Sequence, residues 1–100
     1  WRLAVPSTAP SPGLDTLRAI EWGGALRWYA GEPGERHEAV RGAAARLGGH
    51  AVLYRAPESS RCLEGAFAPL APALLALHRR LKKSFDPRGI LNPGRLYAEF

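Results

Sequence analysis

Apolar and polar residues alternate along the first part of the chain as they do in half-buried strands. Residues 1–6 (WRLAVP) show this alternation, and the proline at the end of the segment stops it. Two more runs rich in β-forming residues, 17–22 (LRAIEW) and 25–30 (ALRWYA), are separated only by Gly23 and Gly24. A two-residue glycine link between such runs is a strong hairpin signal, so we expect a tight β-hairpin here.

After the hairpin and a glycine-rich turn, the apolar positions follow the helical period instead. One face of the predicted helix holds its apolar residues: Val40, Ala43, Ala44 and Leu47. Gly48 and Gly49 follow as a C-terminal stop; because they end a helix rather than open one, they do not predict a phosphate-binding loop. A fourth strand is expected over residues 50–55, with Val52 and Tyr54 on one face.

The longest predicted helix lies in the last third of the chain. Its apolar residues recur at spacings of three and four and form one continuous stripe: Leu70, Leu74, Leu77, Leu81 and Phe85. Pro69 and Pro72 suit the first turn, where a missing N–H is tolerated. Asp86 and Pro87 break the helix, and Asp86 suits a local cap or turn. Residues 88–100 are rich in glycine and proline, so we expect an ordered but irregular tail.

The element order is therefore strand, loop, strand, strand, helix, strand, helix, tail. This order favours an α+β fold, an antiparallel sheet of about four strands with two helices packed on one face. It is typical of a ferredoxin-like half whose first crossover helix has shrunk to the loop over residues 7–13. With 100 residues the chain is long enough for a single compact domain, residues 1–100, and too short for two.

Positive charge is scattered along the sequence. The formal net charge is +5, and the densest basic cluster consists of Arg79, Arg80, Lys82 and Lys83 at the end of the long helix. Cations are favoured at a helix C-terminus for local electrostatic reasons, so a solvated helix end is favoured over a nucleic-acid patch. No apolar run approaches the ~18 residues that predict a membrane-spanning helix.

Histidine and cysteine form no recognisable catalytic or metal-binding pattern in the sequence. His37, His50 and His78 lack metal-ligand spacing, so we expect surface or edge positions, with His78 on the exposed face of the long helix. Cys62 is the only cysteine, which excludes an intrachain disulfide and fits a reduced, cytoplasmic compartment. We expect Cys62 to be a loop thiol rather than a nucleophile.

Three aromatic residues of the predicted hairpin have two interpretations. Trp22, Trp28 and Tyr29 either fill the core between sheet and helices, the commoner arrangement, or form a platform that stacks RNA bases. The second interpretation makes the chain a small basic α+β binding module. A related alternative is a regulatory or assembly domain that pairs edge-to-edge with a partner.

The stretch SFDPRGILNPGR, residues 84–95, is the most distinctive part of the sequence. Its apolar residues are anchors, while its prolines and glycines fix turns that leave Asn92 directed outward. An asparagine amide both donates and accepts hydrogen bonds, which suits the edge of a heterocycle or a ribityl hydroxyl, and Arg95 can reach an anion. The residues alone predict a rigid docking tail.

The run FDPRGILNPG, residues 85–94, resembles the closing motif of FAD-linked oxidases of the vanillyl-alcohol-oxidase type, in which Asn-Pro-Gly-Lys follows an Asp-Pro pair. Three further segments, WRLAVP at 1–6, WGGALRW at 22–28 and GGHAVLYR at 48–55, are similar to one branch of that family, the FAD-binding subunits of bacterial glycolate oxidases. Together these segments extend the resemblance over essentially the whole chain. Arg95 stands where many relatives have lysine, and the charge is kept.

The resemblance implies the C-terminal cap domain of a FAD-linked oxidase subunit, with residues 86–100 as a flavin-proximal tail and the N-terminal FAD-binding domain outside the chain. The residues implied at the cofactor are Asn92, Pro93, Gly94, Arg95 and Arg88. Those implied as candidates on the substrate side are Arg27, Trp28 and Glu21. No residue is assigned a catalytic role and no metal site is expected.

The resemblance also implies an activity, the oxidation of glycolate, a small 2-hydroxy acid, to glyoxylate. The subunit would work beside a second flavoprotein subunit and an iron–sulfur subunit, without nucleic acid, in the cytoplasm and peripheral to the inner face of the membrane through its complex. The flavin supplies the chemistry, and the protein binds and orients it. The chain has no methionine and begins with Trp1, so we expect a fragment that by itself holds FAD weakly or not at all.

Overall fold

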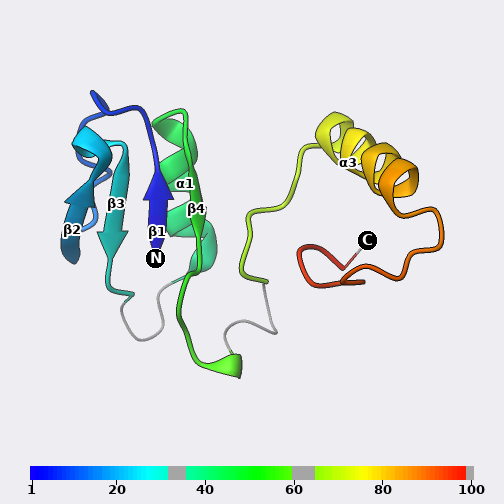
Figure 1. Ribbon diagram of the computed structural model, residues 1–100. Helices are drawn as coiled ribbons and strands as arrows, with labels where there is room; N and C mark the ends of the chain where they lie inside the picture. Colours follow the sequence, from blue (N-terminus) through cyan, green and yellow to red (C-terminus); the bar gives the residue numbers. More distant parts are fainter. Residues whose placement is uncertain (32–35, 60–64, 99–100) are drawn as a thin grey trace. The chain divides into compact units, whose positions relative to one another are not determined.

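The computed structural model describes residues 1–31, 36–59 and 65–98. The chain divides into two compact units, Trp1–Ala68 and Pro69–Phe100, and each is described by itself. The first unit contains a sheet and a helix, and the second contains a long helix and the tail (Figure 1). That both units belong to one cap domain stays a prediction.

The first unit is built on a four-stranded antiparallel sheet with the order β2-β3-β1-β4. Its strands are β1 (Arg2–Ala4), β2 (Leu17–Glu21), β3 (Leu26–Tyr29) and β4 (His50–Val52). The inner strand β1 pairs antiparallel with both β3 and β4, and β2 pairs antiparallel with β3. The connection from β1 to β2 contains no helix, as predicted for residues 7–13. This is the strand order of a ferredoxin-like sheet, so the predicted α+β class is confirmed.

Helix α1 (His37–Arg46) covers one face of this sheet (Figure 1). It buries Val40, Ala43 and Ala44, as the helical spacing predicts. Val40 and Ala44 pack into a core made with residues from the strands and their ends: Trp1, Leu3, Val5, Tyr29, Ala51 and Leu53. The first unit therefore has a hydrophobic core of its own.

The end of α1 is a Schellman motif, as the two glycines predict. Gly48 adopts a φ of 74°, in the left-handed region. Its N–H donates to the carbonyl of Ala45 at 2.9 Å, and the N–H of Gly49 donates to that of Ala44 at 3.0 Å. These two bonds satisfy carbonyls that the helix end would otherwise leave unpaired.

Strand register assigns the residues of the sheet to two faces. Leu3 pairs with Arg27 on one side and Ala51 on the other, and all three are buried. Arg2 pairs with Trp28 in the next register position, so these two belong to the opposite face. One face is thus the core against α1, and we call the other the open face.

Strands β2 and β3 form the predicted hairpin, but their connection is longer than a two-residue turn. Register places Glu21 opposite Leu26, and a short 3-10 turn, η1 (Trp22–Gly24), occupies the connection. All three residues of η1 have positive φ, at 52°, 60° and 99°. The expected two-residue turn is therefore wrong. The left-handed backbone includes Trp22 as well as the two glycines, which favour this conformation.

The second unit consists of helix α3 (Pro72–Phe85) and the tail that follows it. Pro72 occupies the first turn of the helix, as predicted, whereas Pro69 lies before the helix and the expectation for it is wrong. The helix ends at Asp86, whose N–H donates to the carbonyl of Lys82 at 2.7 Å. Among the described residues, no helix is long and apolar enough to cross a membrane.

Four of the five residues of the predicted apolar stripe lie on α3, whereas Leu70 precedes the helix, and no residue of this helix is buried. Leu74, Leu77 and Leu81 are 43%, 48% and 47% exposed, and Phe85 is 81% exposed. The half-buried positions of the helix are Leu75, His78 and Lys82. His78 is therefore not on the exposed face as expected, and the packing of α3 on the same sheet face as α1 stays a prediction.

Candidate functional site

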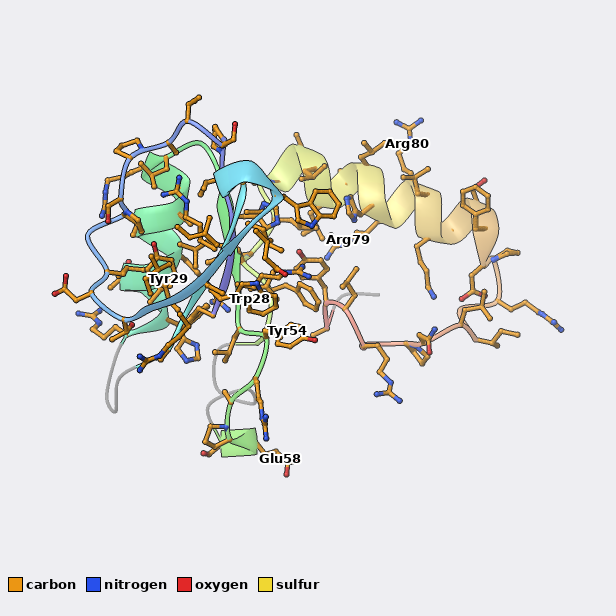
Figure 2. The ribbon with its side chains drawn as sticks, turned by 60° about the vertical axis from the view of Figure 1, so that its left-hand side comes forward. Trp28, Tyr29, Tyr54, Glu58, Arg79 and Arg80 are labelled. Carbon is orange, nitrogen blue, oxygen red and sulfur yellow. The ribbon has the colours of Figure 1, made fainter. Side chains whose placement is uncertain are left out.

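The open face of the sheet brings together two of the three predicted substrate-side residues. Glu21 ends β2 and Trp28 lies on β3, and the indole Nε1 of Trp28 donates to Oε2 of Glu21 at 2.6 Å. Tyr54, just after β4, packs edge-on against Trp28 with ring centroids 4.9 Å apart and an interplanar angle of 85° (Figure 2). The result is a carboxylate held beside two aromatic rings.

Tyr54 was not predicted as a site residue, although the sequence pattern correctly placed it on the same face of the strand as Val52. The alternation along the chain places Tyr54 on the open face, but only the strand order brings β4 and β3 to either side of β1. A ring two strands away from Trp28 therefore has no signal in the local sequence. Tyr54 is 63% exposed.

Arg27, the third predicted substrate-side residue, lies on the opposite face and is 7% exposed. Its guanidinium donates to the carbonyls of Gly24 at 2.9 Å, Pro10 at 2.7 Å and Ala9 at 2.5 Å. These bonds tie the loop after β1 to the tip of the hairpin. The structure therefore separates Arg27 from Glu21 and Trp28, and commits its N–H groups to backbone carbonyls.

The three hairpin aromatics do not share one environment. Tyr29 is 6% exposed in the core, as expected, whereas Trp28 lies on the open face and Trp22 is 83% exposed in η1. The expected core ladder is therefore wrong for Trp22 and Trp28, because neighbouring residues of a strand point to opposite faces and Trp22 is not in a strand. For the same reason, the three rings do not form a single stacking platform.

Asp86 organises the start of the tail, in line with the cap predicted from the sequence. Its Oδ1 accepts the N–H of Ile90 at 3.1 Å, and its Oδ2 accepts that of Leu91 at 2.8 Å. Lys82, one helical turn earlier, places its Nζ 2.7 Å from Oδ2 and also donates to the carbonyl of Leu91. A single carboxylate thus holds the first turn of the tail against the last turn of α3.

These contacts lower the pKa of Asp86 from 3.8 to about 2. The largest cause is the hydrogen bond from Lys82, followed by the backbone N–H of Leu91, and desolvation opposes both. A carboxylate that accepts several hydrogen bonds is stabilised in its charged form. Asp86 is therefore ionised at neutral pH, and its role is to hold backbone rather than to exchange protons.

The predicted cofactor residues 92–95 form one exposed turn. The N–H of Arg95 donates to the carbonyl of Asn92 at 3.3 Å, which closes the turn. Asn92 has a φ of 46° and Gly94 a φ of 66°, both in the left-handed region, which asparagine and glycine tolerate better than other residues. Within the described part of the chain, the Asn92 amide makes no hydrogen bond, so its donors and acceptor are available.

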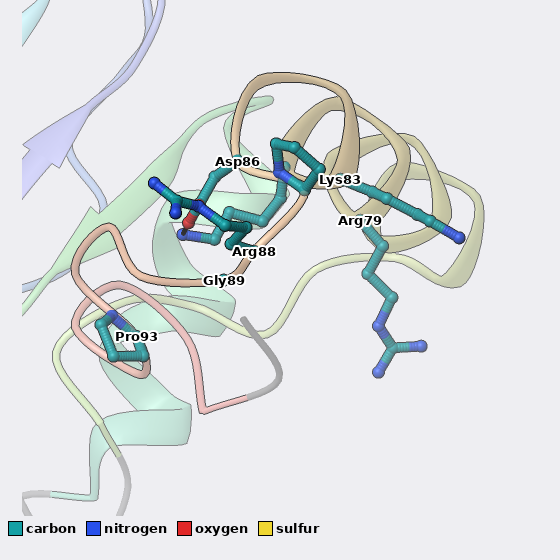
Figure 3. A pocket seen from close by; sticks show the side chains of 8 residues that line it. Arg79, Lys83, Asp86, Arg88, Gly89 and Pro93 are labelled. Carbon is teal, nitrogen blue, oxygen red and sulfur yellow. Dashed lines mark ion pairs between the residues drawn. The ribbon is translucent and has the colours of Figure 1, made fainter.

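Arg88, the remaining predicted cofactor residue, lines an open pocket of about 430 Å³ together with Pro93 (Figure 3). The pocket lies where the last turns of α3 meet the tail, and its lining residues are Arg79, Lys82, Lys83, Asp86, Pro87, Arg88, Gly89 and Pro93. Four of these are cations and one is a carboxylate that is already paired with Lys82. The structure therefore brings two of the five predicted cofactor residues, Arg88 and Pro93, to a basic hollow that suits an anionic ligand, whereas Asn92, Gly94 and Arg95 do not line it.

The histidines and the cysteine add no chemistry to these sites. His37 and His50 begin α1 and β4, and His37 packs edge-on against Trp1 with ring centroids 5.0 Å apart. Cys62 lies outside the described residues. Across 1–31, 36–59 and 65–98, no cluster of acidic, histidine or cysteine side chains has the arrangement of a metal site.

Comparison with known proteins finds a family similarity in the second unit. Residues 69–96 match the family model for FAD linked oxidases, C-terminal domain. Along 99% of its length, the chain is 43% identical to the glycolate oxidase subunit GlcE of Escherichia coli (strain K12). The chain spans 26% of that relative's length. No solved structure matches the chain.

The family match covers α3 and the Asn-Pro-Gly tail, where the sequence motif and the exposed turn coincide. The match to the glycolate oxidase subunit extends the similarity through the sheet. Residues 69–96 are thus similar to the C-terminal domain of the FAD linked oxidases, and the chain as a whole is similar to part of a glycolate oxidase subunit.

Proposed function

We propose that the chain is the C-terminal part of a flavin-dependent subunit that oxidises glycolate to glyoxylate, and that it contributes to the flavin and substrate pocket and to subunit assembly. The observation that carries this proposal is the exposed turn at Asn92, which lies within the segment that matches the FAD linked oxidases. The alternative, a small binding module for RNA or assembly, leaves that segment without a role.

The residues of the tail fit a flavin by their chemistry. Asn92 presents an amide without a hydrogen bond inside the described chain, which can donate to and accept from the edge of a heterocycle or a ribityl hydroxyl. Arg88 and Arg95 are exposed cations that suit an anionic part of the cofactor. Pro93 and Gly94 fix the turn that carries Asn92 and Arg95. Asp86 holds the backbone just before this turn, through the N–H groups of Ile90 and Leu91.

When bound, FAD supplies the hydride-accepting chemistry of such an oxidation. The part of this chain would be to orient the flavin through the tail and the hydroxy acid through the open face of the sheet. There, Trp28 and Tyr54 offer ring surfaces and Glu21 a carboxylate held by the Trp28 indole. We also propose Arg2, which lies opposite Trp28 in the sheet, as the cation for the substrate carboxylate. Arg27, committed to three carbonyls, would support the hairpin.

The proposal includes the partners and the location expected for such a subunit. These are a second flavoprotein subunit and an iron–sulfur subunit, in a cytoplasmic complex that lies peripheral to the inner face of the membrane. The similarity to a glycolate oxidase subunit supports membership of a complex of that kind. The fragment alone would bind FAD weakly, because it spans only 26% of the length of that relative.

The first test is a visible absorption spectrum of the protein in its full natural length, purified with its partners. Flavin bands that bleach on addition of glycolate would support both the cofactor and the substrate class. Flavin bands unmoved by glycolate would contradict the substrate, or move that reaction to the partner subunit. A folded, colourless protein would contradict the flavin role and favour the binding module.

Asn92→Ala in the same protein tests the tail. Loss of one hydrogen bond of roughly 0.5–1.5 kcal/mol predicts roughly two- to twelvefold weaker FAD binding, with an unchanged melting temperature. Ser84→Ala, an exposed position at the end of α3, is the matched control and should leave FAD binding unchanged. Equal FAD affinity in Asn92→Ala and the parent protein would contradict the assignment.

A further inference from the structure

Lys82 differs from the other three cations at the end of α3. Those three are exposed: Arg79, Arg80 and Lys83. The side chain of Lys82 is only 23% exposed, and its ammonium lies 2.7 Å from Oδ2 of Asp86. In Figure 3, by contrast, Arg79 and Lys83 extend away from Asp86. Lys82 therefore takes part in holding the tail, rather than in the solvated helix end that the sequence predicts.

The backbone of Leu91 is held at both of its polar groups by Lys82 and Asp86. Its N–H donates to Oδ2 of Asp86 at 2.8 Å, and its carbonyl accepts from Nζ of Lys82. Asp86 also closes the turn before it: its carbonyl accepts the N–H of Gly89 at 3.1 Å, and its Oδ1 accepts that of Ile90 at 3.1 Å. Asp86 thus fixes the path of the chain up to Leu91, and Lys82 fixes the direction in which the chain leaves it.

The carbonyl that Lys82 holds belongs to the same peptide unit as the nitrogen of Asn92. A peptide unit is planar, so the carbonyl of Leu91 and the N and Cα atoms of Asn92 move as one rigid group. Asn92 itself has a φ of 46°, in the left-handed region that residues other than glycine adopt uncommonly. Such a conformation persists where its surroundings determine it. The bond from Lys82 is one such determinant, because rotation of this peptide unit would break it.

We propose that Lys82 is a positioning residue for the flavin: by holding the carbonyl of Leu91, it keeps the amide of Asn92 in the orientation that binds the cofactor. The inference rests on the proposed function, since it takes the turn at Asn92 as the flavin contact. Without Lys82 the turn would sample other orientations, and the apparent FAD affinity would fall with the fraction of molecules in the competent one. Because Lys82 acts only through Asn92, its loss should weaken FAD binding no more than loss of the Asn92 amide does.

Titration of FAD into the apoprotein in its full natural length, followed by flavin fluorescence, tests the proposal. Lys82→Met keeps an unbranched side chain of good helix propensity but removes the N–H donors. It should weaken FAD binding at least about twofold, and by no more than the roughly two- to twelvefold expected for Asn92→Ala. The matched control is Arg80→Met, which removes one positive charge at an exposed position of the same helix and should bind FAD as the parent does.

A double variant separates positioning from a general effect on stability or charge. In the Asn92→Ala protein no amide remains to be positioned, so adding Lys82→Met should not weaken FAD binding further. Two effects that are independent would instead multiply. Lys82→Arg keeps a charged N–H donor and should bind FAD more tightly than Lys82→Met does.

The remaining outcomes overturn the proposal and distinguish its failure from that of the flavin assignment. If Asn92→Ala weakens FAD binding and Lys82→Met does not, the turn binds flavin without Lys82, and only the positioning role is lost. If the two changes weaken binding independently, Lys82 acts by its charge or through the stability of α3. If Asn92→Ala leaves FAD affinity unchanged, the flavin assignment of the turn fails and the positioning role fails with it. Far-ultraviolet circular dichroism verifies that each variant is folded.

Discussion

Replacing Gly49 with alanine should destabilise the first unit much more than replacing its neighbour Gly48. A Cβ at Gly49 would lie 2.1 Å from the carbonyl oxygen of Ala4, 2.7 Å from Cγ1 of Val5 and 2.9 Å from the Cα of Val5. Two of these atoms belong to the backbone at the end of β1, so the strand itself would have to move. Since Ala4 pairs with His50 in the sheet, that movement would also strain the pairing of β1 with β4.

At Gly48 the backbone conformation, rather than a lack of space, is the reason for a glycine. A Cβ at Gly48 meets nothing within 4 Å, and only its φ of 74° disfavours alanine. Left-handed backbone costs an alanine roughly 1–2 kcal/mol, whereas forcing a methyl group into a packed site costs roughly 1–3 kcal/mol and more where backbone must shift. We therefore expect Gly48→Ala to lower the free energy of unfolding by roughly 1–2 kcal/mol and Gly49→Ala by at least about 3 kcal/mol.

Urea unfolding followed by tryptophan fluorescence measures this difference, because Trp1 is buried in the core of the first unit. A gap of at least about 1–2 kcal/mol should also separate the two melting temperatures by roughly 4–16 °C for a domain of this size. If Gly49→Ala unfolds at the same urea concentration as Gly48→Ala, or at a higher one, the close approach of α1's end to β1 is not a constraint on the sequence.

Two further predictions concern Asp86 and Arg27. The pKa of Asp86 is lowered from 3.8 to about 2, so the ionised carboxylate stabilises the tail. This stabilisation should be fully present above a pH of about 3.8 and should disappear as the pH falls through about 2. Amide exchange at Ile90 and Leu91 should lose its protection over that range, while Asp86→Asn should lack protection at neutral pH too; protection that persists below the range would refute the contact. Arg27→Met should leave buried carbonyls unpaired and cost about 1–3 kcal/mol of unfolding free energy, unlike Arg18→Met on the exposed strand β2. Urea unfolding measures this cost. Equal stability of the two variants would mean that the carbonyls do not hold Arg27, which would again be a candidate substrate contact.

Features set by local chemistry could be predicted from the sequence. Helix α1 follows from its helical spacing of apolar residues, and its end follows from two glycines that can adopt left-handed backbone. The hairpin follows from β-rich runs on either side of a glycine pair, although the number of residues in its connection does not. Short-range patterns therefore determine where the elements lie, with small errors at their ends.

Features that depend on residues far apart in sequence could not be predicted. Arg27 is buried because carbonyls of the loop at Ala9 and Pro10 reach it, and a strand pattern contains no sign of those acceptors. Tyr54 meets Trp28 only through the strand order. The leucine stripe of α3 is visible in the sequence, but whether anything covers it is a property of the surroundings of the helix.

The segment most distinctive in sequence is the one with the least internal packing. Residues 69–96 match the FAD linked oxidases, yet within them α3 buries no side chain, and Ile90 and Leu91 are 62% and 57% exposed. Asp86 fixes the backbone at the start of the tail. Packing inside this segment constrains few of the remaining side chains, because none of those on α3 is buried. A recognisable sequence that its own packing does not require must be specified by what it contacts outside itself. For the turn at Asn92 we propose that this contact is the flavin.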